Sequence, residues 1–324
     1  MVDSGYLATP HTDGKQPLRI GFVMPTFGVY ARGLGAREAH RVLARRAESL
    51  GFESLWSPDH LALPAEFKEP YPYSESGKFP LALDTPFLEP LAYLSFLAGI
   101  TDRVKLGTSI LVLPLRPAIL TAKLLATADV LSGGRVILGG GVGYLKEEME
   151  ILGVSFADRG KITDETIAAL RDLWTSADPG MEGEIVSYRN MKFEPKPIQP
   201  SIPIWLGGHS RPMMRRIART GDGCIFGAFD FEEFKRQRDL LEDECEKNNR
   251  DPSTVEKIVY LTHTNSADDF LRQMEPYVAA GMTYFLGALP YWSNDVSEMF
   301  GLTQYVSERL GLSEPEVRRE YFVD

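Results

Sequence analysis

The sequence has few cysteines, little positive charge and no pattern of metal ligands. Of its 324 residues only Cys224 and Cys245 are cysteine, and their separation fits neither a disulfide framework nor a zinc motif. None of the five histidines stands at metal-ligand spacing to another. The formal net charge of −10 argues against nucleic acid and anionic membranes as general partners. We therefore expect no metal site and no nucleic-acid binding.

Long apolar runs are also lacking. No run approaches the roughly 20 residues that a membrane span needs, and residues 1–16 are polar, without the apolar core of a signal peptide. We expect a soluble cytoplasmic protein with no membrane partner. Residues 1–17 are expected to form a flexible N-terminal segment. With 44% hydrophobic residues, positions 18–324 can bury the core of a single domain.

Short apolar segments alternate with stretches of helical periodicity along the chain. The predicted strands are 18–24, 54–57, 104–113, 136–138, 203–206, 223–226, 257–262 and 283–286, each followed by a predicted helix. Eight strand-then-helix units predict a (β/α)8 TIM barrel, with a doubly wound open sheet as the runner-up. Two insertion loops interrupt the alternation, a proline-rich loop near 61–87 and an excursion near 175–202 that we interpret as a hairpin.

Four glycines follow the fourth predicted strand, at positions 139, 140, 141 and 143. Glycines at the carboxyl end of a parallel strand remove side chains where ligands bind in α/β proteins. Three known motifs nearly fit and each fails. A dinucleotide fingerprint would need glycine at Tyr144, a P-loop would need glycine at Ser155, and nucleophile elbows fail at Leu111 and Pro212. We favour a ligand site here; a tight turn without a ligand is the alternative.

Polar residues follow several of these strands and would meet at one end of a barrel. They are Thr26, Asp59, His60, Ser109, His209 and His263, together with the glycines at 141, 143, 207 and 208. His60 is the candidate acid or base, because histidine titrates near neutrality; alternatively it is a loop histidine hydrogen-bonded to a neighbour such as Asp59. Composition alone does not exclude a Ser-His-Asp hydrolase.

Residues 207–210 precede a predicted helix that Ser210 would cap. The free backbone N–H groups and the positive end of the helix dipole at such a place bind phosphate well. An ordinary strand-to-helix turn fits the same residues.

Several of these segments resemble one family. GGRVILGGGVGYLKEE at 133–148, FADRG at 156–160, PIWLGG at 203–208 and SPDH at 57–60 are similar to the bacterial luciferase-like flavin and deazaflavin oxidoreductases. Residues 85–90 and 106–116 extend the resemblance to the subgroup that depends on coenzyme F420. The resemblance covers roughly 18–290. It implies a (β/α)8 barrel, a homodimer, and a tricyclic cofactor at the carboxyl end of the barrel.

The resemblance also implies roles for individual residues. Those implied to bind the cofactor are Thr26, Asp59, Thr108, Ser109, Ile110, Gly141, Val142, Gly143, Gly207, Gly208, His209 and Ser210, the last four at its phosphate. A non-prolyl cis peptide bond is expected at Ser109-Ile110. His60 matches the active-site histidine of the deazaflavin-dependent dehydrogenases, and we expect His60 and Tyr144 to be catalytic. Because Pro64 replaces their tryptophan and Tyr144 their glutamate, oxidation of a sugar or simple alcohol is not expected.

The sequence thus predicts a coenzyme F420-dependent oxidoreductase that transfers a hydride between the deazaflavin and a small organic substrate, with His60 as proton donor or acceptor. Reduction of an activated C=C or C=N bond is our hypothesis for the substrate, and the 61–87 loop is expected to form part of a lid. One alternative is a two-component monooxygenase that uses FMN, with a flavin or F420 reductase as a partner protein. Another is a non-catalytic flavin-binding protein.

Overall fold

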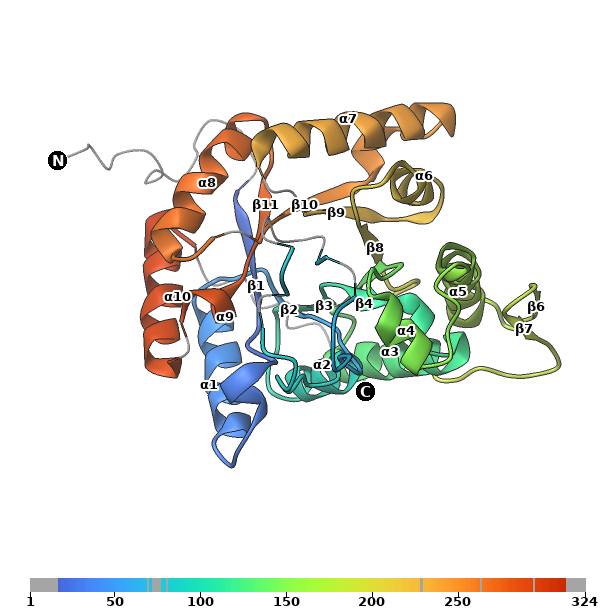
Figure 1. Cartoon of the computed structure of the whole chain (residues 1–324), viewed down its shortest axis with the longest axis horizontal. Helices are drawn as coiled ribbons and strands as arrows, with labels where there is room; N and C mark the ends of the chain where they lie inside the picture. Colours follow the sequence, from blue (N-terminus) through green and yellow to red (C-terminus); the bar gives the residue numbers. More distant parts are fainter. Residues whose placement is uncertain are drawn as a thin grey trace, which may run out of the picture.

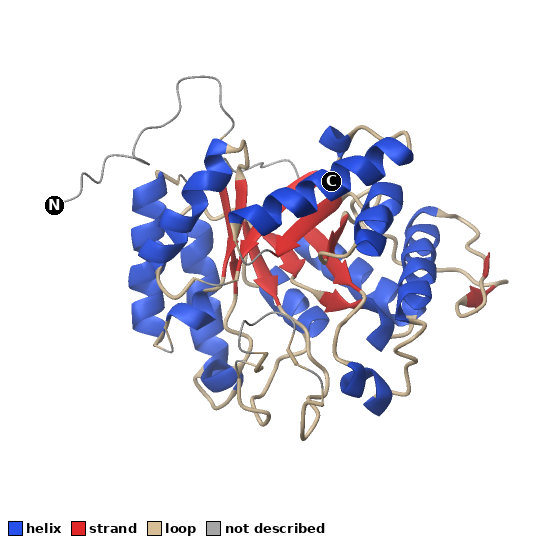
Figure 2. Ribbon diagram, turned by 45° about the horizontal axis from the view of Figure 1, so that its top comes forward, coloured by secondary structure: helices blue, strands red, loops and turns tan. Residues whose placement is uncertain are grey.

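The strands form a closed parallel barrel. The computed structural model describes residues 17–68, 70–71, 77–79, 81–227, 230–262, 264–293 and 295–312, so most of the predicted N-terminal segment and His263 lie outside the described residues. The strands are β1 (Arg19–Val23), β2 (Ser54–Ser57), β3 (Lys105–Thr108), β4 (Leu111–Val112), β5 (Val136–Gly141), β8 (Ile204–Gly207), β9 (Gly223–Gly227), β10 (Glu256–Leu261) and β11 (Tyr284–Gly287). β1 pairs with both β2 and β11, and β3 pairs with β5, which closes the ring (Figure 2). The predicted (β/α)8 barrel is confirmed, and the open sheet is excluded.

Helices surround the ring of strands (Figure 1). They are α1 (Ala36–Ser49), α2 (Pro90–Ala98), α3 (Ala118–Ser132), α4 (Lys146–Ile151), α5 (Arg159–Thr175), α6 (Arg211–Thr220), α7 (Phe231–Lys247), α8 (Ala267–Ala279), α9 (Leu289–Trp292) and α10 (Val296–Leu310). Side-chain caps start several of them: Ser266, for example, accepts a hydrogen bond from the Asp269 N–H. Ser210 holds the N-cap position of α6, but its side chain makes no capping hydrogen bond, contrary to our prediction. No helix within the described ranges is long and apolar enough to cross a membrane.

The two insertions differ in form. Within 175–202 the antiparallel strands β6 (Met181–Glu182) and β7 (Ser187–Tyr188) make the predicted hairpin, which stands beyond α5 in Figure 1. The loop at 61–87 contains no helix or strand in its described part, apart from an isolated bridge between Phe27 and Phe87.

Large side chains fill the interior of the barrel below its carboxyl end. Trp56 of β2 packs against Trp205 of β8 with ring centroids 5.7 Å apart, and Trp205 meets Tyr284 of β11 edge to face. Glycine opposite each indole makes this layer fit, because a Cβ at Gly107 would lie 2.4 Å from the Trp56 ring and one at Gly223 would lie 2.6 Å from that of Trp205. This packed layer fills the barrel interior, so space for a ligand lies above it, at the carboxyl ends of the strands.

Two strand predictions need correction. The predicted strand 104–113 is divided into β3 and β4 by the cis peptide bond Ser109-Ile110, whose position is confirmed. The predicted strand 136–138 extends to Gly141, because Gly139 and Gly140 pair with β8, and Gly140 and Gly141 pair with β4. The glycines therefore belong to the barrel wall as well as to the turn that follows it.

Candidate active site

A cavity of about 1040 Å³ opens at the carboxyl end of the barrel. The predicted site residues that line it are Asp59, His60, Ser109, Ile110, Gly141, Val142, Gly143, Tyr144, Gly207, Gly208, His209 and Ser210. They end or follow β2, β3, β5 and β8, so the barrel brings together segments that lie far apart in the sequence. Their roles as ligands or catalysts remain predictions.

Two predicted cofactor ligands do not line the cavity. Thr26 is fully buried; its hydroxyl accepts a hydrogen bond from Ser57 Oγ at 3.5 Å, and its carbonyl accepts from the Leu88 N–H. Thr108 is also fully buried, and its hydroxyl donates to the Gly139 carbonyl at 2.8 Å while accepting from the Gly139 N–H at 3.1 Å. The Thr108 side chain therefore ties β3 to the backbone of β5, whereas the Thr26 hydroxyl meets the Ser57 side chain.

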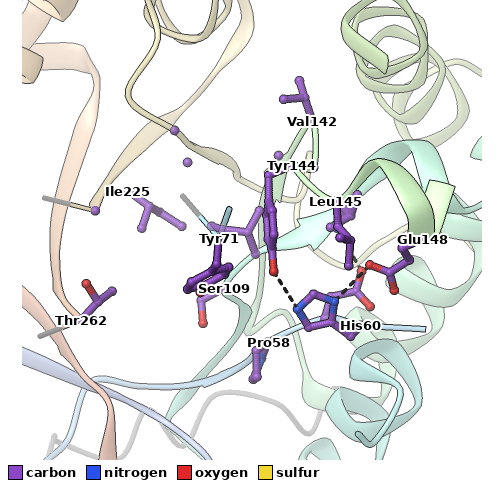
Figure 3. A pocket seen from close by; sticks show the side chains of 18 of the residues that line it. Pro58, His60, Tyr71, Ser109, Val142, Tyr144, Leu145, Glu148, Ile225 and Thr262 are labelled. Atoms are coloured by element: carbon purple, nitrogen blue, oxygen red, sulfur yellow. Dashed lines mark hydrogen bonds and ion pairs between the residues drawn. The ribbon is translucent and has the colours of Figure 1, made fainter. Parts of the chain in front are cut away.

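His60 is held between two side chains. Its Nδ1 lies 3.0 Å from Glu148 Oε2, and Tyr144 Oη lies 3.5 Å from its Nε2. Figure 3 shows the two partners on opposite sides of the imidazole ring. A carboxylate can only accept, so in neutral His60 the proton resides on Nδ1 and the lone pair of Nε2 points toward the tyrosine. The side chain is 12% exposed, so the ring meets the cavity while remaining packed.

Glu148 is the orienting group, and the sequence interpretation gave it no role. It stands in the first turn of α4 and its Oε1 accepts hydrogen bonds from the Leu61 and Ala62 N–H groups at 2.7 and 3.1 Å. Burial alone would raise the pKa of Glu148, but the bond from His60 and those from the two backbone N–H groups outweigh it, and the pKa lies below its ordinary value. The sequence signal that could have indicated Glu148 is a carboxylate in the first turn of the helix that follows the glycine-ended strand.

Asp59 does not contact His60 through its carboxylate. Both oxygens bind Arg116, at 2.7 and 2.8 Å, and Oδ2 also accepts from the Val112 N–H at 3.0 Å. Arg116 in turn donates to Glu89 at 2.8 Å. The alternative in which Asp59 is the hydrogen-bond partner of His60 is wrong. Asp59 lines the cavity, but its charge is used to fix β4.

Packing within the protein explains the glycines of the cavity wall. A Cβ at Gly141 or Gly207 would each lie 2.8 Å from the side chain of Ile110, and one at Gly143, where φ is +77°, would lie 2.4 Å from Met149. The space that a side chain at these glycines would need is thus occupied by Ile110 and Met149, while their predicted role in cofactor binding stays a prediction. What the glycines offer the cavity is bare backbone.

The side of the cavity next to α6 suits an anion. Residues 207–210 lead into the first turn of α6, whose N–H groups carry the positive end of the helix dipole. Arg159 also lines the cavity; its guanidinium lies 3.8 Å from the Phe156 ring centroid and donates to the Phe156 carbonyl at 2.7 Å. Its Nε is buried and has no hydrogen-bond partner within the described ranges. In the sequence, Arg159 is recognisable only as part of the FADRG segment at 156–160.

Aromatic side chains form the wall around His60. Phe87 and Phe79 meet the imidazole edge to face at 5.2 and 5.6 Å, and Tyr71 meets Tyr144 in the same way at 5.3 Å. Three of these residues come from the 61–87 loop, which also contributes Leu81. Part of the predicted lid therefore lines the cavity.

Comparison with known proteins agrees with this architecture. A protein of unassigned function from Mycobacterium tuberculosis is 38% identical over 194 residues, which are 60% of this chain and 67% of that protein. The F420-dependent glucose-6-phosphate dehydrogenase of Amycolatopsis mediterranei is 33% identical over 187 residues, 56% of this chain and 51% of the enzyme. The structure of an F420-dependent secondary alcohol dehydrogenase superposes with a TM-score of 0.72 at 18% identity, covering 91% of this chain and 99% of the other.

The whole barrel is accounted for by one family. Residues 18–307, from the start of β1 into α10, match the sequence profile described as luciferase-like monooxygenase. Since that match includes every strand of the closed ring and both sides of the cavity, the chain belongs to the luciferase-like monooxygenase family.

Proposed function

We propose that the protein is an oxidoreductase that uses the deazaflavin coenzyme F420 to exchange a hydride with a small organic substrate. Support comes from the similarity to F420-dependent enzymes. The observation that carries the proposal is the pairing of His60 with Glu148 at the cavity wall. When bound, the deazaflavin supplies or accepts the hydride. The chain supplies orientation, a dry pocket and a proton.

The residues of the cavity fit such a cofactor. The hydroxyl of Ser109 is buried at the cavity wall and has no partner in the part of the chain that the structure describes, which is an unusual cost unless a ligand atom satisfies it. Bare backbone at Gly141, Gly143, Gly207 and Gly208 borders the same space. Arg159 and the start of α6 would hold the anionic tail. The volume of about 1040 Å³ is at the upper end for a ligand pocket, which leaves room for a second molecule.

His60 would exchange the proton that accompanies hydride transfer. Glu148 keeps the proton of neutral His60 on Nδ1, so that Nε2 is the atom that takes a proton from a substrate hydroxyl or, when protonated, gives one to a substrate acceptor. Tyr144 Oη at 3.5 Å occupies the same space and would hydrogen-bond to that substrate atom. The aromatic residues of the 61–87 loop would exclude water during the reaction.

One observation favours a second candidate. A helix start reinforced by an arginine suits a terminal phosphate, which is what FMN carries, so an FMN-dependent monooxygenase served by a reductase would use the same anion site.

Titration of the apoprotein separates these functions. We expect F420 to bind more tightly than FMN, and reduced F420 to be reoxidised in the presence of an acceptor at a rate that His60→Ala lowers. Binding of FMN alone would exclude the deazaflavin assignment. Tight binding of either cofactor with no transfer to any acceptor, unaltered by His60→Ala, would favour a non-catalytic flavin-binding protein.

A further inference from the structure

The surroundings of His60 are rich in carboxyl groups. Glu148 touches the imidazole, its neighbour Glu147 is buried and accepts from the Lys68 N–H, and Asp59 and Glu89 share the guanidinium of Arg116. The four carboxylates together carry four negative charges, and the one guanidinium carries a single positive charge. Even with His60 protonated, the sum of these charges stays negative. Glu147, Glu148 and Asp59 are at most 8% exposed, so solvent screens their charges little.

The positively charged side chain that lines the cavity lies in a different part of it from His60. Arg159 is the only lysine or arginine among the described residues that line it. Arg159 lies beside α6, because Arg216 of that helix binds the Gly160 carbonyl at 3.1 Å. His60 follows β2, and β3, β4 and β5 separate β2 from the strand that leads into α6. Arg159 therefore lies beside the predicted anion site at the start of α6, and we expect it to meet the cofactor tail rather than a substrate at His60.

The loop over His60 adds no cation to the lining. Its two described lysines, Lys68 and Lys78, are exposed and do not line the cavity. The loop positions outside the described residues, 69, 72–76 and 80, hold no lysine or arginine in the sequence. The described part of the loop presents aromatic and aliphatic side chains to the cavity: Tyr71, Phe79 and Leu81, with Phe87 at its end.

We propose that the substrate is an uncharged molecule with a flat, largely apolar body and one polar atom that reaches His60, and that the cavity discriminates against phosphorylated and carboxylated compounds. This inference rests on the proposed function and narrows its substrate class. Aromatic edges pack favourably against a flat conjugated ring. A substrate anion beside buried carboxylates that outnumber the one nearby guanidinium is repelled, by roughly tenfold or more in affinity for each added negative charge. Discrimination by repulsion needs no specific contact with the rejected molecule.

Matched probes test the charge preference on the protein loaded with F420. Acetophenone is compared with 4-acetylbenzoate, and 2-acetylnaphthalene with 6-acetyl-2-naphthoate, because each pair differs only by a carboxylate. Glucose 6-phosphate serves as the sugar phosphate. Dissociation constants are measured from the change in cofactor fluorescence. We expect each neutral ketone to bind at least about tenfold more tightly than its carboxylate, and glucose 6-phosphate not to bind.

A charge substitution provides the converse test. Leu81→Lys places a cation on the cavity wall and is expected to improve carboxylate binding roughly tenfold relative to the neutral probe. Leu83→Lys is the matched control, because Leu83 is in the same loop, 39% exposed and outside the cavity lining. If no neutral probe binds more tightly than its carboxylate, or if both lysine variants act alike, the inference is wrong.

Failure of the proposed function gives a different result. The F420 titration is scored separately, so a protein that binds F420 but prefers the carboxylates refutes only the substrate class. A protein that does not bind F420 refutes the cofactor assignment whichever probe it prefers.

Discussion

Replacing Glu148 by Gln should reverse the tautomer of His60. In the wild type, Oε1 accepts from the Leu61 and Ala62 N–H groups and Oε2 accepts from His60 Nδ1. A glutamine side chain has one oxygen, and we expect this oxygen to accept the hydrogen bonds from both backbone N–H groups. Its NH₂ group must then face Nδ1 and donate to it, so the proton of neutral His60 moves to Nε2. The variant keeps size and shape but presents the wrong nitrogen to the substrate.

The effect on rate should be large and that on stability small. General acid–base catalysis typically contributes about 10²–10⁴ in rate, so Glu148→Gln should lose most of that range if His60 exchanges the proton. Two of the three hydrogen bonds survive in neutral form, and losing their charge assistance costs about 1–2 kcal/mol of unfolding free energy, less the relief of burying a carboxylate. The hydride-transfer rate should therefore fall far more than the melting temperature.

Nitrogen NMR of histidine-labelled protein reports the tautomer directly, and stopped-flow oxidation of the reduced cofactor reports the rate. Glu147→Gln is the matched control: Glu147 is the neighbouring buried carboxyl group, its Oε1 accepts from the Lys68 N–H, and an amide oxygen can do the same. We expect the control to keep the wild-type spectrum and rate. A Glu148→Gln protein with the wild-type His60 tautomer and an undiminished rate would refute the assigned role of Glu148.

Three further predictions concern stability and the cavity wall. Folding lowers the pKa of Glu148, so its ionised form stabilises the protein at pH values above the ordinary pKa of 4.5, and this stability is lost as the pH falls through the folded pKa. In urea titrations, the difference in unfolding free energy between wild type and Glu148→Gln should therefore shrink as the pH is lowered into the acid range. Arg116→Met leaves Asp59 buried and unpaired and should cost about 3–5 kcal/mol in urea unfolding. Ser109→Ala removes a buried hydroxyl without a partner in the described chain, so the melting temperature should hold or rise while cofactor affinity falls about tenfold.

The fold could be predicted from the sequence because its signal repeats. Eight strand-then-helix units leave few closed arrangements, and each unit is short enough for periodicity to reveal it. Strand 104–113 shows the limit of that reasoning: nothing in its apolar pattern indicates that the chain divides at Ser109-Ile110, and only the family resemblance did so. In the same way, the sequence did not show that Gly139 to Gly141 continue β5, because this depends on their pairing with β8 and β4.

The candidate site could be predicted in position but only partly in detail. Carboxyl ends of parallel strands converge whatever their sequence, so residues that follow strands were found. The direction of a side chain depends on partners that are distant in sequence, and these were missed. Thr108 faces Gly139, 31 residues away, and His60 faces Glu148, 88 residues away. The ion pair between Asp59 and Arg116, 57 residues away, was likewise not indicated by the sequence.

Asp59 and His60 are adjacent in the chain yet are held by different parts of the barrel. Asp59 binds the Val112 N–H and Arg116, which fixes the strand that begins immediately after Ile110, while His60 binds Glu148 across the mouth. We therefore expect the position of the proposed proton donor to be coupled, through two consecutive residues, to that of the segment at 109–110. Because packed contacts of this kind shift together, a substitution that moves Ile110 should also disturb the geometry of His60, although the two side chains belong to different strand ends.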